Sequence, residues 1–251
     1  MFKTGIVSVT FRKKTVDEII ALAAANGLQA IEVGSDVHAP RENLAECRRV
    51  AALAEKAGIV IASYGSYYRL GQGEDFAEYI EAARALGAGN IRIWAGAKGS
   101  ANVTEDEWQT LIDDAKRCAD MAHQNGMTLS FEYHGGTLTD TADTALRLMR
   151  EIGHASASLY WQPNQYRDVA FNAEALERVL PYVSNVHIFA WAAVDGRVLR
   201  YPLAEHEADW RRYLDILASD GRDRYLLMEF VKDDADAAFV EDAKTLAAWV
   251  G

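Results

Sequence analysis

The chain has 251 residues, half of them apolar, and a formal net charge of −11 from 37 acidic and 26 basic residues. This acidity repels nucleic acids and anionic membrane surfaces, so we expect a small-molecule partner and neither nucleic acid nor membrane. No stretch approaches the roughly 18 apolar residues of a membrane span, and the first residues lack the apolar region of a signal peptide. The sequence therefore predicts a cytoplasmic protein with one domain over residues 1–251.

Short apolar runs alternate with longer segments of helical period, which is the pattern of βα units around a parallel sheet. A helix is expected after every strand. The predicted strands, in chain order, are residues 3–9, 29–34, 58–63, 90–95, 127–132, 157–161, 183–189 and 224–230.

Capping motifs and glycines mark where the predicted helices begin and end. Thr15-Val-Asp-Glu18 and Thr104-Glu-Asp-Glu107 have the capping-box form and mark the starts of the first and fourth helices. Four helices are expected to end before a glycine, at Asn26-Gly27, Ala57-Gly58, Leu86-Gly87 and Asn125-Gly126. The eight units favour closure into a single (β/α)8 TIM barrel of the α/β class. A doubly wound sheet is less favoured because no Gly-x-Gly-x-x-Gly opens a helix after the first strand.

Four polar residues end apolar strands in the second half of the chain: Glu132, Gln162, His187 and Glu229. In a closed barrel the carboxyl ends of the strands converge, and active sites lie there. Two carboxylates, an imidazole and an amide oxygen can hold a divalent metal beside an acid/base pair. The structural alternatives are a salt bridge between a glutamate and Arg92, a hydrogen-bonded core histidine, and an amide that binds only a substrate hydroxyl. We favour the metal interpretation.

Further residues near the strand ends are candidates for substrate binding: His38, Tyr64, Trp94, His134, Trp191 and Arg197. Aromatic side chains at strand ends suit stacking on the apolar faces of a sugar ring. Ordinary core or surface positions are the alternative, and for His38 a surface position is favoured. The segment from Phe189 to His206 is the longest irregular stretch, and we expect it to form a lid or a substrate wall.

The chain resembles the xylose isomerase-like, or AP endonuclease family 2, TIM-barrel superfamily of sugar phosphate isomerases and epimerases. The motifs that carry the resemblance span nearly the whole chain: Thr4-Gly-Ile-Val-Ser-Val-Thr-Phe11, Ile31-Glu-Val33, Phe131-Glu-Tyr-His134, Val186-His-Ile188 and Met228-Glu-Phe230. The resemblance implies one divalent metal, Mn²⁺ first and Mg²⁺, Co²⁺ or Zn²⁺ as alternatives. Its ligands would be Glu132, Gln162, His187 and Glu229, and the two glutamates would also move the proton. Relatives form dimers or tetramers, so a homo-oligomer stays open.

Two motifs depart from the family pattern. Where members often have Asp-x-x-His after the sixth strand, this chain has Gln162-Pro-Asn-Gln165, which removes one ligand charge and one imidazole. Where many continue the seventh strand as His-x-Lys-Asp, it reads His187-Ile-Phe-Ala-Trp191, which removes two charged contacts. Substrate specificity therefore does not carry over from the family.

From this resemblance we expect a metal-dependent isomerase or epimerase of a sugar-like substrate, in which Glu132 and Glu229 transfer a proton through an enediolate. The same enolate could expel a β-leaving group, so a lyase or dehydratase of a keto-sugar or keto-glycoside is the first alternative. The missing ligand charge at Gln162 adds weight to it. A phosphodiester hydrolase resembling endonuclease IV and a non-catalytic ligand-binding barrel rank lower.

Overall fold

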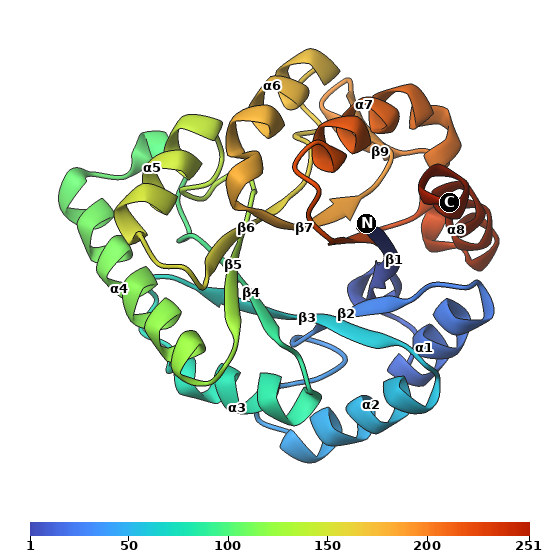
Figure 1. Cartoon of the computed structure of the whole chain (residues 1–251), viewed down its shortest axis with the longest axis horizontal. Coiled ribbons are helices and arrows are strands. Elements are labelled where there is room, and N and C mark those ends of the chain that lie inside the picture. Colours follow the sequence, from blue (N-terminus) through green and yellow to red (C-terminus); the bar gives the residue numbers. More distant parts are fainter.

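A computed structural model describes the whole chain, residues 1–251, and contains a closed barrel of parallel strands surrounded by helices (Figure 1). Around the barrel the strands follow the order β1, β10, β7, β6, β5, β4, β3, β2. Their bounds are β1 Phe2–Val7, β2 Ala30–Gly34, β3 Val60–Arg69, β4 Asn90–Trp94, β5 Thr128–Glu132, β6 Ala157–Trp161, β7 Val183–Ile188 and β10 Arg224–Met228. The predicted (β/α)8 TIM barrel is confirmed.

Eight helices lie outside the barrel (Figure 1). They are α1 Val16–Ala25, α2 Leu44–Lys56, α3 Phe76–Leu86, α4 Glu105–Gln124, α5 Ala142–Ile152, α6 Val169–Val179, α7 Glu207–Ala218 and α8 Asp236–Val250. Both predicted capping boxes are present, at Thr15 before α1 and at Thr104 before α4. None of the helices combines the length and the apolar character that a membrane crossing requires.

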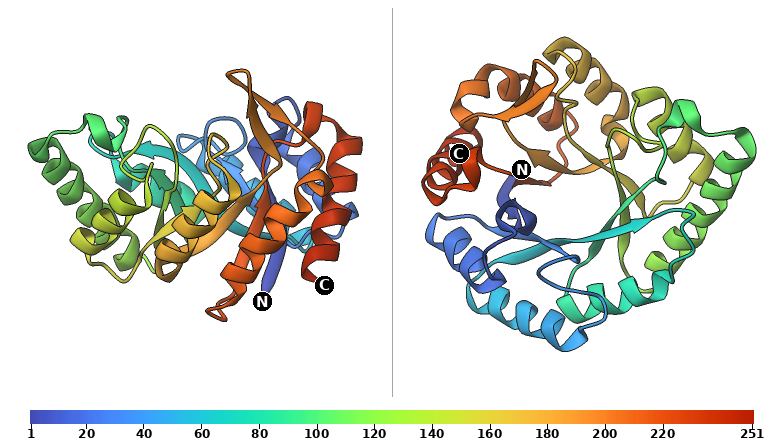
Figure 2. Two further views of the ribbon diagram at one scale, coloured as in Figure 1. Left: turned by 90° about the horizontal axis from the view of Figure 1, so that it is seen from above. Right: turned by 180° about the vertical axis from the view of Figure 1, so that it is seen from behind.

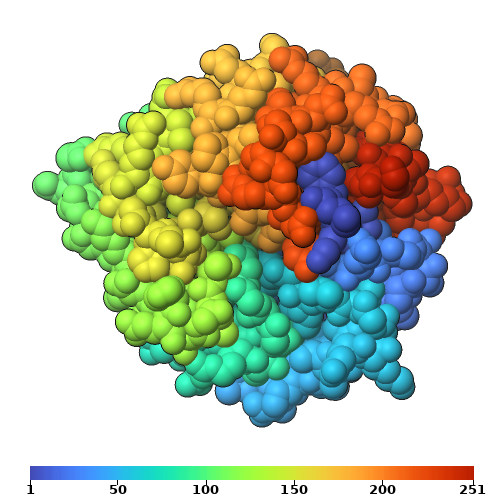
Figure 3. Space-filling view, in the orientation of Figure 1, coloured from blue at the N-terminus to red at the C-terminus, as the bar shows by residue number.

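The barrel closes where the first strand pairs with the last barrel strand. Phe2 to Ile6 of β1 lie in register with Arg224 to Met228 of β10. In the space-filling view the N-terminal residues accordingly lie against the C-terminal part of the chain (Figure 3). Short 3-10 helices complete the connections: η1 Ser8–Phe11, η2 Ser100–Asn102, η3 Leu180–Tyr182, η4 Leu203–His206 and η5 Lys232–Asp234.

The predicted irregular segment from Phe189 to His206 is largely regular, which corrects the sequence-based expectation. It contains an antiparallel hairpin of β8 (Trp191–Val194) and β9 (Arg197–Arg200), followed by η4. Asp195 and Gly196 connect the strands with φ angles of 49° and 74°. Asp-Gly is a favoured sequence for the two-residue turn that reverses a hairpin, and it is the sequence signal for this one. The hairpin projects beyond the end of the barrel opposite the N-terminus (Figure 2).

Candidate active site

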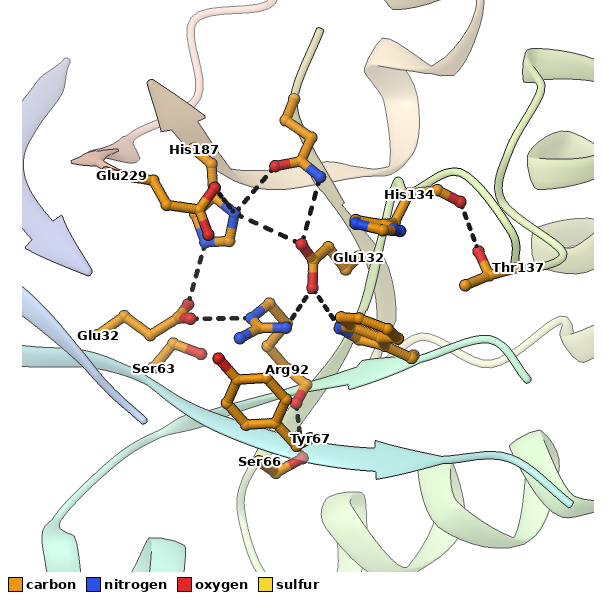
Figure 4. Close-up of polar contacts among 12 residues, drawn as sticks. Glu32, Ser63, Ser66, Tyr67, Arg92, Glu132, His134, Thr137, His187 and Glu229 are labelled. Carbon is orange, nitrogen blue, oxygen red and sulfur yellow. Dashed lines mark hydrogen bonds and ion pairs between the residues drawn. The ribbon is translucent and has the colours of Figure 1, made fainter. Parts of the chain in front are cut away.

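The four polar residues predicted to converge do so at the carboxyl end of the barrel. Glu132 ends β5, His187 lies in β7, and Gln162 and Glu229 directly follow β6 and β10. Figure 4 shows Glu132, His187 and Glu229 pointing toward one another. One donor atom from each of Glu132, His187 and Glu229 lies within 4.8 Å of the others, and all three side chains are buried. The Gln162 amide lies between Glu132 and His187. Its Nε2 donates to Glu132 Oε1 at 3.2 Å, and its Oε1 is 3.3 Å from His187 Nδ1.

A third carboxylate of the site, Glu32 of β2, was not among the predicted site residues. Its side chain is fully buried, with Oε1 accepting a hydrogen bond from Arg92 Nε at 2.8 Å and Oε2 lying 3.5 Å from His187 Nε2. The signal that could have identified it is a carboxylate in the middle of the apolar run Ala30-Ile-Glu-Val33, where an unpaired charge would be very unfavourable.

Arg92 of β4 joins two of these carboxylates. It donates to Glu32 through Nε and to Glu132 through Nη1, and its own side chain is buried. Glu132 therefore forms the salt bridge with Arg92 that was the structural alternative, and it also lies beside His187. Gly65 makes this approach sterically feasible, because a Cβ at that position would lie 2.7 Å from Glu32 Oε1 and 2.9 Å from Arg92 Nη2.

The surroundings of the carboxylates shift their pKa values in different directions. Burial opposes ionisation of Glu32, but Arg92 and His187 outweigh it and lower its pKa to about 2. The pKa of Glu132 is likewise lowered, because Arg92 and His187 prevail over burial. Burial and the neighbouring Glu132 carboxylate raise the pKa of Glu229. Burial disfavours protonation of His187, but Glu229, Glu32 and Glu132 prevail and raise its pKa.

This charge distribution fits a divalent cation. Three buried carboxylates face one buried guanidinium, so two negative charges are uncompensated when all three carboxylates are ionised and the imidazole is neutral. His187 Nδ1 lies 3.9 Å from Glu132 Oε1 and 3.6 Å from Glu229 Oε2. Oxygen ligands about 2.1 Å from an octahedral cation lie roughly 3 to 4 Å from each other, so these spacings suit ligands of one ion. Glu32 beside Nε2 would orient the imidazole, as carboxylates do behind metal-bound histidines.

A cavity of about 490 Å³ opens above these residues and is lined by Arg12, Tyr67, Arg92, Trp94, Glu132, Tyr133, His134, Gly135, Asp140, Gln162 to Tyr166, Trp191, Glu229 and Phe230. Trp94 Nε1 donates to Glu132 Oε2, and the His134 ring stacks on Trp94 with 4.7 Å between the ring centroids. Aromatic rings thus form much of the wall, and the ionised groups lie at its base.

Three of the six predicted substrate contacts line this cavity, namely Trp94, His134 and Trp191, and the other three do not. His38 is buried rather than on the surface, with Nδ1 2.9 Å from Ser8 Oγ and Nε2 3.2 Å from the Lys14 carbonyl oxygen.

Tyr64 is also buried, and its hydroxyl donates to the carbonyl oxygen of Ala39. Arg197 is exposed beside the hairpin turn. The cavity-lining tyrosine of β3 is instead Tyr67. Neighbouring side chains of a strand point to opposite faces. Gly65 faces Glu32 inside the barrel, so Tyr67, two residues later, points to the same side, whereas Tyr64 points to the other.

Variants of Gln162 should separate the contribution of the amide from that of the imidazole. Gln162→Ala should weaken Mn²⁺ binding less than His187→Ala does, because a neutral amide oxygen supplies no charge. Gln162→Asp should tighten binding by adding a carboxylate beside His187 Nδ1. Isothermal titration with Mn²⁺ measures all three affinities, and identical affinities in the three variants would place the metal site elsewhere.

Comparisons with known proteins agree with this architecture. A family model described as xylose isomerase-like TIM barrel matches residues 20–249. A 3-dehydroshikimate dehydratase of Bacillus anthracis is 24% identical over 204 residues, which are 74% of this chain and 70% of that protein. An inosose dehydratase of Geobacillus thermodenitrificans is 30% identical over 89 residues, or 34% of this chain and 29% of that protein. The crystal structure of a probable 3-DHS dehydratase from Bacillus anthracis superimposes with a TM-score of 0.81 at 19% identity, covering 98% and 99% of the two chains.

Proposed function

The chain belongs to the xylose isomerase-like TIM-barrel family, and we propose that it is a divalent-metal-dependent dehydratase of a carbohydrate-derived β-hydroxy ketone. The observation that carries the proposal is the buried cluster of Glu132, His187 and Glu229 at the base of the aromatic cavity. The names of the three matched relatives, all dehydratases, favour elimination over the isomerisation or epimerisation that the resemblance first implied.

The reaction needs a base for a carbon-bound proton and an acid for the departing hydroxyl. Glu229 is suited to the first task, because it lines the cavity and, unlike Glu132, forms no ion pair with an arginine; its carboxylate lies 3.6 Å from His187 Nδ1. It would take the proton next to the carbonyl, and the resulting enolate would expel the β-hydroxyl as a carbon–carbon double bond forms. The protonated Glu229 would then give that proton to the leaving oxygen, so that one water is released and the carboxylate is restored.

The remaining residues hold the substrate and the metal. Glu132, Gln162, His187 and Glu229 would hold a divalent cation, which when bound supplies Lewis acidity to the substrate carbonyl. Arg92 keeps Glu132 ionised and oriented. Trp94 and Trp191 would pack against the substrate and exclude water from the cavity.

An isomerase or epimerase remains the second candidate, because two carboxylates flank the same imidazole at 3.9 and 3.6 Å. Epimerisation requires proton transfer from opposite faces of one carbon, so Glu132 would have to act as a second acid or base. Its Oε2 already accepts hydrogen bonds from both Arg92 and Trp94. These donors stabilise the ionised carboxylate and make it a weaker base, which favours elimination with Glu229 alone.

Proton NMR in D2O distinguishes the two reactions. Mg²⁺-loaded protein is incubated separately with inosose, 3-dehydroshikimate and a ketohexose. Elimination gives a dehydrated product and the release of water, which is the expected result for one of the first two compounds. Deuterium that enters a recovered or epimerised ketose without any dehydrated product would favour the epimerase. Absence of both reactions in metal-loaded protein would count against both candidates for these substrates.

Changes in the β8–β9 hairpin should affect turnover more than metal binding. Trp191 lines the cavity, stacks on Phe189 with centroids 3.9 Å apart and donates from Nε1 to the Phe230 carbonyl oxygen. Trp191→Ala, and separately a shortened hairpin, should lower kcat/KM at least about tenfold, or about 1.4 kcal/mol, and leave the metal in place. Val198→Ala, at an exposed position of β9, is the matched control. Wild-type kinetics in both test variants would reject the prediction that this segment forms a lid over the substrate.

A further inference from the structure

The backbone that follows Glu229 has an unusual conformation. Phe230 has a φ of 49°, and Asp233 and Asp234 have φ angles of 57° and 50°. Side chains other than glycine rarely adopt this left-handed region, so it persists only where surrounding contacts fix it. Because Phe230 is bonded directly to Glu229, whatever fixes Phe230 also limits where the Glu229 carboxylate can lie.

Contacts from three different elements converge on Phe230. Its amide N–H donates to Thr10 Oγ1 of η1 at 3.0 Å, and its carbonyl oxygen accepts from Trp191 Nε1 of β8 at 3.2 Å. The guanidinium of Arg200, the last residue of β9, lies 4.7 Å from the centroid of the Phe230 ring. The two strands of the hairpin therefore contact the residue next to Glu229 in different ways, one through the backbone and one through the ring.

Arg200 also contacts Asp234, the last of the three left-handed positions. Its Nη1 lies 2.6 Å from Asp234 Oδ1, and its guanidinium is 6.0 Å from the centroid of the Trp191 ring. A partly exposed ion pair alone stabilises little. A planar guanidinium that lies over the Phe230 ring while pairing with Asp234 restricts two of the three left-handed residues and attaches the hairpin to this loop.

We propose that Arg200 is a positioning residue, which closes the β8–β9 hairpin onto the loop after β10 and through Phe230 fixes Glu229 at the base of the cavity. This inference rests on the proposed role of Glu229 as a metal ligand and base. Arg200 does not line the cavity, so it would act through Phe230 and not by contact with a substrate.

Three variants test the proposal. Arg200→Ala removes both contacts, whereas Arg200→Lys keeps a cation for Asp234 but loses the planar group above Phe230. Arg197→Ala is the matched control, since Arg197 lies exposed on the same strand and outside the cavity lining. Thermal unfolding should show an intact fold in all three.

Hydrogen–deuterium exchange on the metal-free protein measures the attachment itself, independently of any catalytic role. Arg200→Ala should speed exchange at least about fivefold in residues 191–200 and 229–234, Arg200→Lys should give an intermediate effect, and Arg197→Ala should leave residues 229–234 unchanged. Wild-type exchange at 229–234 in Arg200→Ala would overturn the proposal, whatever the function of the protein.

Electron paramagnetic resonance titration with Mn²⁺ then measures the consequence for Glu229. Arg200→Ala should weaken Mn²⁺ binding at least about fivefold, with partial rescue by lysine and no effect of Arg197→Ala. Faster exchange with unchanged Mn²⁺ affinity would overturn the positioning of Glu229 and leave Arg200 only a structural contact. Wild-type protein that binds no Mn²⁺ would instead refute the proposed metal function, and the exchange data would still decide whether Arg200 holds the loop.

Discussion

Glu132→Gln and Glu229→Gln should each nearly abolish turnover and leave the fold intact. Glutamine keeps the shape of the side chain and removes the charge, which the proposed metal binding requires at both positions and the proposed proton transfer requires at Glu229. Loss of a group that transfers a proton lowers rates by about 10²- to 10⁴-fold, and loss of a metal ligand adds to this. The measurement is kcat/KM on the substrate that the NMR experiment identifies, with Glu55→Gln on the exposed side of α2 as the surface control.

The two substitutions should differ in their effects on stability. Glu132 is the ionised partner of Arg92, so Glu132→Gln should lower the melting temperature of the metal-free protein. The pKa of Glu229 is raised, because burial and Glu132 disfavour its ionised form, so Glu229→Gln should not destabilise the metal-free protein at neutral pH. Retention of more than about a tenth of wild-type activity in either variant would reject its role.

The second large effect is expected from His187, at the centre of the cluster. His187→Ala should lower the affinity for Mn²⁺ more than any single amide substitution, because it removes the only imidazole among the ligands. In the wild type, the raised pKa values of His187 and Glu229 mean that protons compete with the metal. Affinity should therefore rise with pH and level off above these pKa values, with up to about two protons released per ion.

The same shift predicts how the stability of the metal-free protein depends on pH. A histidine whose pKa is raised on folding stabilises the protein below its unfolded pKa, about 6.5, and this contribution is lost as pH rises through the folded pKa. The melting temperature of the metal-free wild type should therefore fall as pH rises from the unfolded pKa of His187 through its folded pKa. The His187→Ala variant should show a smaller fall. A pH-independent melting temperature together with pH-independent Mn²⁺ affinity would contradict the charge distribution described for the site.

The sequence predicted the barrel and the convergence of four polar residues because both follow from local patterns. Glu132 and His187 each end an apolar run, and parallel strands of a closed barrel bring such ends together. Glu32 was missed as a site residue because its role depends on Arg92 from a strand two positions away. The hairpin has the sequence pattern of an irregular loop, because its strands are short and only the Asp195-Gly196 turn marks them.

The substrate-contact predictions were less successful for a different physical reason. A strand places neighbouring side chains on opposite faces, so an error of one residue moves a contact from the cavity to the outside of the barrel. Tyr64 packs outside the barrel and Tyr67 lines the cavity. The left-handed conformation at Phe230 could not be predicted from the sequence, because glycine is the residue that usually adopts it and the chain has phenylalanine there.

Metal content tests the central claim most directly. The purified protein and a Glu132→Gln/His187→Ala double variant are dialysed against excess Mn²⁺ and then against buffer, and bound metal is measured by inductively coupled plasma mass spectrometry. One Mn²⁺ per chain in the wild type and less than about a tenth of that in a folded double variant is the predicted result, since two of the converging ligands are gone. Equal metal content in the two proteins, or no bound metal in the wild type, would contradict a metal centre formed by Glu132, His187 and Glu229.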